Sequence, residues 1–97
     1  MIIVHDTFVC KPGNASKLAK KFKEAMTGNN DLVHVMTDMT GQFNRVIMVT
    51  QFENLTAYEQ SWEKYMKHSE EMKKMEEAMA GYQEMYLTGS REIFKVW

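Results

Sequence analysis

The sequence predicts an α+β domain whose elements follow the order β-α-β-β-α-β. Three observations predict it. Runs of β-branched residues alternate with segments whose apolar residues recur at helical spacing, and turn residues separate these segments. The length of 97 residues, with 44% hydrophobic and 26% charged content, matches one globular domain. We therefore expect a single domain over residues 1–97, with no internal linker or repeat.

The first strand and the first helix are expected on either side of Pro12 and Gly13. The run from Ile2 to Cys10 is apolar and rich in β-branched residues, which is typical of a strand. From Asn14 the apolar residues recur at helical spacing, and Gly28 is placed to end the helix. The apolar residues of this helix are Ala15, Leu18, Ala19, Phe22, Ala25 and Met26.

Two further strands, DLVHVMTDM and RVIMVTQFE, are joined by the segment TGQFN. Gly41 and Asn44 in this segment suit the positive φ angles of a hairpin connection. Both strands are apolar at odd and at even positions, whereas a sheet with one wet face would alternate. We therefore expect both faces of the sheet to be covered.

The second helical segment carries many of the aromatic residues and methionines. Thr56, with Glu59 three residues later, forms a capping-box pattern at its start. A continuous helix from Thr56 to Gln83 would extend ~42 Å, beyond the ~30 Å reach of the strands. A break is therefore expected near KHSEE, with Ser69 as a new N-cap. The apolar stripe of this segment comprises Tyr58, Trp62, Tyr65, Met66, Met72, Met75, Met79 and Tyr82.

The last strand is predicted at REIFKVW, residues 91–97. It completes the split β-α-β arrangement called ferredoxin-like, with an antiparallel sheet and both helical segments on one face. The other face would still carry apolar side chains, and such a patch on a small domain is typical of a partner surface. A second copy packing sheet to sheet, which makes a homodimer, is the simplest cover.

Charge and hydropathy exclude several classes of partner. The formal net charge of -1 gives no general attraction to nucleic acid or anionic lipid. No run approaches the ~18 apolar residues of a membrane span, and the N-terminus lacks the basic segment of a signal peptide. We therefore expect a cytoplasmic protein with no nucleic acid or membrane partner. Cys10 is a single cysteine and is interpreted as an apolar filler rather than a reactive thiol.

No metal site and no cofactor site is indicated. The three histidines lack the His-x-His or His-x-x-x-His spacing of a metal motif. Soft thioethers suit copper(I), but only Met72 and Met75 have a fitting spacing, and flexible methionines that fill a core explain the stripe better. A surface lined by methionine would also adapt to an apolar ligand.

Two long segments, IIVHDTFVCKPG and TGQFNRVIMVTQFENLTAYEQSWEKY, resemble the NIPSNAP-like proteins. These belong to the dimeric α/β-barrel superfamily, which also contains the antibiotic-biosynthesis and haem-degrading monooxygenases. The resemblance implies a homodimeric barrel of two sheets, with a cavity between sheet and helices in each subunit. Haem-degrading relatives use an asparagine on the first strand and a tryptophan and a histidine on the second long helix. Only Trp62 matches that pattern, and it is carried over as part of a cavity wall.

The candidate site residues form two groups. His5, Asp6 and His34 are candidates for a general base, because histidine titrates near neutral pH and the two histidines could point into one cavity with Asp6 or Asp38 nearby. Structural hydrogen bonding is the alternative for each. The side chains expected to bind a ligand are those of Asn44, Arg45, Trp62, Tyr65, Met66 and His68.

Two functions remain open on the sequence alone. The first is a homodimer that binds a small apolar or aromatic ligand between the sheet and the helices. The second is a cofactor-independent monooxygenase of the antibiotic-biosynthesis type. Such an enzyme needs little more than an apolar cavity, a base and a substrate that forms a stabilised carbanion.

Overall fold

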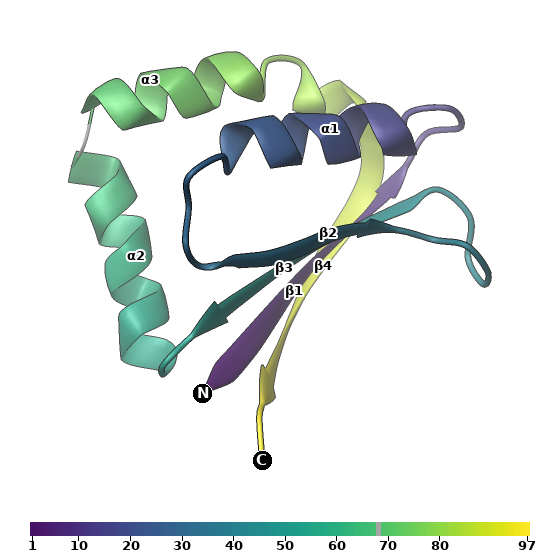
Figure 1. Ribbon diagram of the computed structural model, residues 1–97. Helices are drawn as coiled ribbons and strands as arrows, with labels where there is room; N and C mark the ends of the chain where they lie inside the picture. The colour runs from purple at the N-terminus through teal and green to yellow at the C-terminus, as the bar shows by residue number, and fades with distance from the viewer. Residues whose placement is uncertain (68) are drawn as a thin grey trace.

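The computed structural model describes residues 1–67 and 69–97, with all their side chains except those of Tyr65, Lys67, Ser69 and Glu71. The strands form one antiparallel sheet in the order β2-β3-β1-β4, and the helices cover one face of it (Figure 1). The predicted α+β, ferredoxin-like fold is thereby confirmed. The elements are β1 (Ile2–Cys10), α1 (Ala15–Ala25), β2 (Leu32–Thr37), β3 (Arg45–Phe52), α2 (Leu55–Lys67), α3 (Ser69–Ala78), the 3-10 helix η1 (Tyr82–Glu84) and β4 (Tyr86–Lys95).

The core lies between α1 and one half of the sheet. Leu18 and Phe22, four residues apart on one face of α1, are buried against Cys10 and Val46. The ring of Phe8 on β1 meets the ring of Phe22 at 5.0 Å between centroids. Burial raises the pKa of the Cys10 thiol, so this cysteine is neutral and acts as the apolar filler that the sequence predicted.

The connection between β2 and β3 has the backbone that its residues predicted. Gly41 has φ +88° and Asn44 has φ +63°, a region that glycine and asparagine enter most easily. The Asp38 side chain accepts a hydrogen bond of 2.7 Å from the backbone N–H of Arg45, which closes the loop just before β3 begins. Local contacts therefore shape this turn, and the backbone N–H of Cys10 also donates a 2.7 Å hydrogen bond to the Asn44 carbonyl oxygen.

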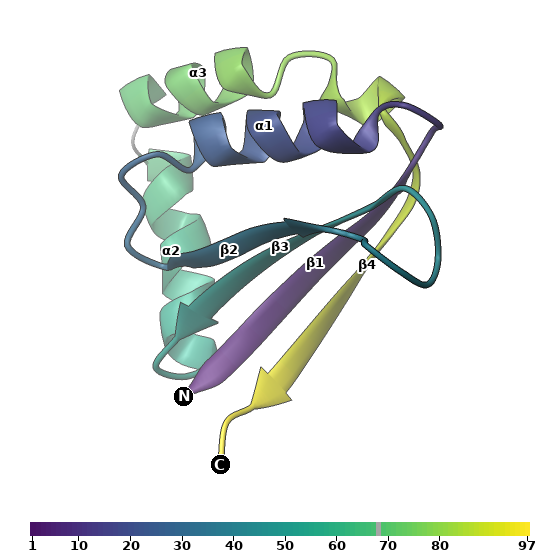
Figure 2. The ribbon, with the colours of Figure 1, turned by 45° about the vertical axis from the view of Figure 1, so that its right-hand side comes forward.

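The second helical segment is divided, as expected, into α2 and α3. α2 stands at one end of the sheet, and α3 runs at a steep angle to it and lies beside α1 (Figures 1 and 2). α3 begins at Ser69, so this serine is the first residue of the helix instead of the N-cap that the sequence predicted, and His68 lies outside the described residues. None of the helices in the described ranges is long and apolar enough to cross a membrane.

Several predicted boundaries are wrong, and three of them affect the site. α2 begins at Leu55 and is capped by Asn54, whose side-chain oxygen accepts a hydrogen bond of 2.8 Å from the Ala57 N–H, so Thr56 is a helical residue instead of the cap. α3 ends at Ala78 instead of Gln83, because Gly81 with φ +80° turns the chain into η1. β4 begins at Tyr86 instead of residue 91.

The face of the sheet that lies away from the helices is uncovered in the single chain. Side chains alternate between the two faces along each strand, and the register of the strands brings together the residues of this open face. Met36 is 38% exposed and Phe94 is 45% exposed. The apolar residues of the open face are Ile3, Val9, Met36, Ile47, Val49 and Phe94.

Replacing the two competing cap residues separately tests the start of α2. Asn54→Ala should lower the free energy of unfolding by about 1 kcal/mol, because the Ala57 N–H loses its acceptor. Thr56→Ala should leave stability unchanged or slightly higher, since alanine is the better helix former. Urea unfolding followed by circular dichroism measures both, and a larger loss for Thr56→Ala would show that the capping-box prediction was right.

Candidate functional site

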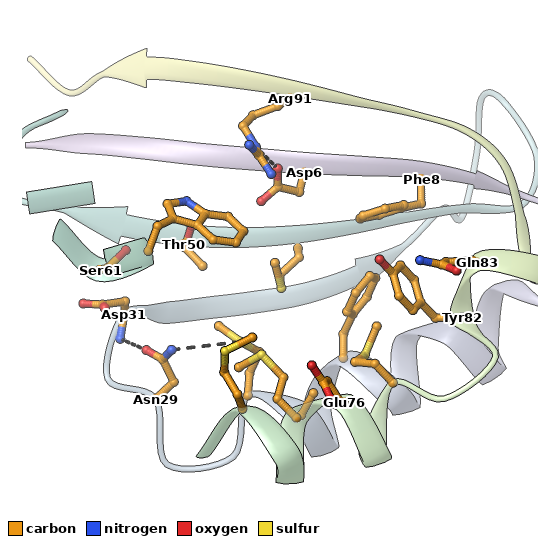
Figure 3. Close-up of a pocket in the computed structure, with 18 of the residues that line it drawn as sticks. Asp6, Phe8, Asn29, Asp31, Thr50, Ser61, Glu76, Tyr82, Gln83 and Arg91 are labelled. Atoms are coloured by element: carbon orange, nitrogen blue, oxygen red, sulfur yellow. Dashed lines mark hydrogen bonds and ion pairs between the residues drawn. The ribbon is translucent and has the colours of Figure 1, made fainter. Parts of the chain in front are cut away.

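A cavity of about 680 Å3 lies between the sheet, α2, and the layer formed by α1 and α3 (Figure 3). This volume lies within the range of small-molecule sites. β1, β3 and β4 supply the sheet side, α2 supplies a lateral wall, and α1, α3 and η1 supply the side opposite the sheet. The cavity is therefore built by every helix and by three strands.

One end of the cavity is apolar and continues into the core. Phe8 and Phe22 line it from the core side, Met72 and Met75 line it from α3, and Met79 lines it from the turn that follows α3. Met79 also packs against the buried core cluster, as the sequence predicted for the whole methionine stripe. Met72 and Met75 differ from that prediction, because they face the cavity instead of filling a core. Flexible thioethers in such a wall can adapt to the shape of a ligand.

The other end of the cavity holds a charged pair. Asp6 on β1 and Arg91 on β4 are direct partners in the antiparallel register, on the face toward the helices. The Nε–H of Arg91 donates a hydrogen bond of 2.5 Å to Oδ1 of Asp6 (Figure 3). Asp6 is only 6% exposed, so this contact compensates for its burial. The hydrogen bond to Asp6 is also the main cause that raises the pKa of Arg91.

A series of aromatic contacts joins this charged pair to α2. Phe52 at the end of β3 meets Tyr58 at 5.0 Å between ring centroids, and Tyr58 meets Trp62 edge-on at 6.3 Å. The guanidinium carbon of Arg91 lies 5.4 Å from the centre of the Trp62 ring, which is a cation-π distance. Tyr58 and Trp62 are four residues apart and share one face of α2. These contacts hold α2 against the end of the sheet.

The hydroxyl of Tyr58 is buried and finds no hydrogen-bond partner among the described residues. A buried polar group without a partner costs about 1–3 kcal/mol, so native structures rarely retain one unless the group has a use. Tyr58 lines the cavity beside Trp62 and Arg91. The polar end of the cavity therefore contains a hydrogen-bond donor, the Tyr58 hydroxyl, for which the described residues provide no acceptor.

Negative charge gathers on the side of the cavity away from the sheet. Figure 3 shows Glu76 and Asp31 across the cavity from Arg91. The backbone N–H of Asp31 donates a 2.8 Å hydrogen bond to Oδ1 of Asn29, which shapes the loop that follows α1. With Asp6 included, three carboxylates and one guanidinium line the cavity among the described residues.

Three of the predicted site residues line this cavity: Asp6, Trp62 and Met66. Trp62 is 50% exposed and Met66 is 72% exposed, so both lie toward its open side. The side chain of Tyr65 and the whole of His68 lie outside the described part of the chain.

Asn44 and Arg45 lie at the hairpin, away from this cavity. Asn44 lines a smaller hollow of about 430 Å3 together with Phe43 and Asp38. The Arg45 side chain donates hydrogen bonds to the backbone carbonyl oxygens of Gln42 and Thr40. Arg45 therefore stabilises the loop, and its predicted role in ligand binding has no support from its position.

His5 and His34 lie on the open face of the sheet, on either side of Val49. Adjacent residues of a strand point to opposite faces, so His5 points away from the cavity that Asp6 lines. The expectation that these histidines share one cavity with Asp6 is therefore wrong. The ring of His5 instead meets Phe94 edge-on at 5.1 Å.

The residues that sequence reasoning missed are Tyr58 as a polar group and Arg91. Tyr58 was assigned to the apolar stripe, and its position next to the start of α2 gave no sign of a buried hydroxyl. Arg91 lies 85 residues from Asp6, so only the register of β1 and β4 brings the pair together. In the described ranges, no three histidine, cysteine or carboxylate side chains gather as a metal site would require.

Comparison with known proteins identifies relatives for both the sequence and the fold. The sequence matches the NIPSNAP family over residues 5–88, and no curated protein matches it. A NIPSNAP domain protein of uncharacterised function from Burkholderia xenovorans superposes with a TM-score of 0.81 at 11% identity, covering 100% of this chain and 95% of its own. A NIPSNAP family protein from Agrobacterium tumefaciens gives 0.77 at 11% identity, with 97% and 90% covered.

A candidate antibiotic biosynthesis monooxygenase from Chloroflexus aurantiacus has the same fold at a TM-score of 0.64 and 7% identity, covering 96% of this chain and 89% of its own. Identities this low show the fold alone. The family match is different, because it spans residues 5–88 of 97. The chain therefore belongs to the NIPSNAP family, as its resemblance to NIPSNAP-like proteins predicted.

Proposed function

We propose that this NIPSNAP protein is a homodimer that binds a small apolar or aromatic ligand in the cavity between sheet and helices. The observation that carries the proposal is the cavity itself, whose volume of about 680 Å3 suits a molecule of a few fused rings. Half of the residues that line it are phenylalanine, tyrosine or methionine. An apolar ligand would bury this lining and gain about 25 cal/mol for each Å2 removed from water.

The homodimer is supported by the open face of the sheet. It presents apolar side chains from β2, β3, β1 and β4, interspersed with polar ones such as His5 and Thr7, and Met36 and Phe94 are more than a third exposed. Small monomeric proteins rarely leave such a face in water. A second copy, related by a two-fold axis, would cover this face with its own copy of the same face. Dimers of this two-fold symmetry are the commonest soluble oligomers.

Filling the cavity should abolish ligand binding. The uncharged fluorescent probe N-phenyl-1-naphthylamine should brighten and saturate with the wild-type protein. Met75→Trp replaces the thioether on α3 with a bulky indole ring that fills part of the cavity, and it should weaken binding of the probe by roughly tenfold or more. Lys73→Trp, on the exposed side of the same helix, should bind the probe as the wild type does. Equal binding by both variants would show that the probe binds elsewhere.

A charge on the open face should separate the dimer. Native mass spectrometry of the wild type should give twice the 11.4 kDa mass of the chain. Ile47→Lys should give the monomer, because it buries an unpaired ammonium group between the two sheets. The control Ile93→Lys makes the same change on the opposite face, where Ile93 is already 42% exposed, and should stay dimeric. A monomeric wild type would contradict the homodimer.

A cofactor-independent monooxygenase is the second candidate function, and the position of Asp6 favours it. This carboxylate lies at the polar end of an apolar cavity, where a base could remove a proton from a bound substrate. The candidate monooxygenase from Chloroflexus aurantiacus shares the fold.

Oxygen uptake tests this second candidate. With anthrone, a polycyclic ketone whose enol tautomer is a phenol, the wild type should consume oxygen. Asp6→Asn, which keeps the shape but removes the basic group, should reduce the rate by at least about 100-fold. Circular dichroism checks that the variant is folded. Uptake by the wild type no faster than in buffer would exclude the activity for this substrate class and leave the binding function as proposed.

A further inference from the structure

We propose that the ligand of the cavity is an uncharged apolar molecule with a carbonyl oxygen, which accepts hydrogen bonds from the Tyr58 hydroxyl and the Arg91 guanidinium. The inference rests on the proposed binding function and adds the chemical class of the ligand. Three observations on the described residues carry it: a buried hydroxyl that finds no partner among them, a guanidinium of which they use only one N–H group, and an excess of carboxylates around the cavity.

The Tyr58 hydroxyl supplies the first donor. It is buried in the wall of the cavity and has no hydrogen-bond partner in the described part of the chain. Its ring contacts the rings of Phe52 and Trp62. A ligand atom that accepts its proton would satisfy a group that the folded chain leaves unsatisfied.

Arg91 supplies the second donor. One of its five N–H groups is used by Asp6, and the guanidinium lies over the Trp62 ring with 49% of the side chain exposed. Trp62 is in ring contact with Tyr58 and lies under the guanidinium, so one side chain joins the two donors, and both line the same cavity. Because arginine only donates, the ligand atom that meets both groups has to be an acceptor.

The charges around the cavity favour an acceptor without a charge of its own. The carboxylate of Asp6 already balances the guanidinium of Arg91. The remaining charged residues of the lining, Asp31 and Glu76, are acidic. A carboxylate ligand would therefore enter a cavity of negative net charge and lose its hydration there. A carbonyl oxygen has two lone pairs, meets both donors and avoids that cost.

Access to Tyr58 requires a neighbour to move. The hydroxyl is buried, so a ligand reaches it only by displacing a side chain that covers it. Trp62 is half exposed and in ring contact with Tyr58, which makes it the neighbour best placed to shift. Ligand binding should therefore change the fluorescence of Trp62, and a Trp97→Phe background removes the other tryptophan.

Three naphthalenes of nearly the same shape test the proposal by displacing N-phenyl-1-naphthylamine. They are 2-acetonaphthone, which has a carbonyl oxygen, 2-isopropenylnaphthalene, which has a methylene group in its place, and 2-naphthoate, which has a charge. The ketone should bind about tenfold more tightly than the alkene, and the naphthoate should bind most weakly.

Tyr58→Phe keeps the ring and removes only the hydroxyl. It should weaken binding of the ketone about tenfold and leave the affinity for the alkene unchanged. The melting temperature should not fall, because the hydroxyl has no partner among the described residues. Thr56→Val removes a hydroxyl from the exposed side of α2 and should change none of the three affinities.

Equal affinity for ketone and alkene, or an unchanged ketone affinity in Tyr58→Phe, would overturn the carbonyl inference while leaving the cavity as a binding site. Preference for the naphthoate would overturn the uncharged class in favour of an acid. If none of the naphthalenes binds and the probe itself does not bind, the proposed function fails, and this inference fails with it.

Discussion

The division of the second helical segment into α2 and α3 is the constraint on which the rest of the structure depends. A straight helix of this length would extend past the sheet, whereas α2 spans ~20 Å and α3 spans ~15 Å. α2 rises at the end of the sheet, and α3 returns beside α1 (Figures 1 and 2). Only α1 packs closely on the sheet to form the core. The space next to α2 and beneath α3 therefore remains as the cavity.

This arrangement divides the covered face of the sheet into two environments. Phe8 and Asp6 are two residues apart on β1 and point to the same side, yet Phe8 packs against the core and Asp6 forms an ion pair with Arg91. A buried carboxylate is tolerated only where a hydrogen-bonding partner reaches it. Arg91 reaches it from β4 and also stacks on Trp62 of α2. The same residue thus compensates a buried charge, holds α2 in place and presents donors to the cavity.

Sequence reasoning succeeded where the signal was local. The bounds of β1, the positive φ angles at Gly41 and Asn44, and the break before Ser69 all follow from neighbouring residues or from the length of a helix. It failed at the start of α2, where Asn54 and Thr56 are both good caps and only the three-dimensional path of the chain selects one. It also failed where strand register decides: the sequence cannot show that Asp6 meets Arg91, or that His5 lies on the other face.

The two faces of the sheet carry side chains with different roles. On β3, Met48 and Thr50 face the cavity, while Ile47 and Val49 face the open side. This explains why the strands are apolar at odd and even positions alike. Alternate side chains face the helices and the cavity, and the side chains between them form the surface proposed for a second copy. Because successive side chains point in opposite directions, a substitution on the open face can test the proposed assembly without changing a cavity residue. The proposed dimer and the proposed ligand binding can therefore be tested by separate mutations, even though both would depend on the same strands.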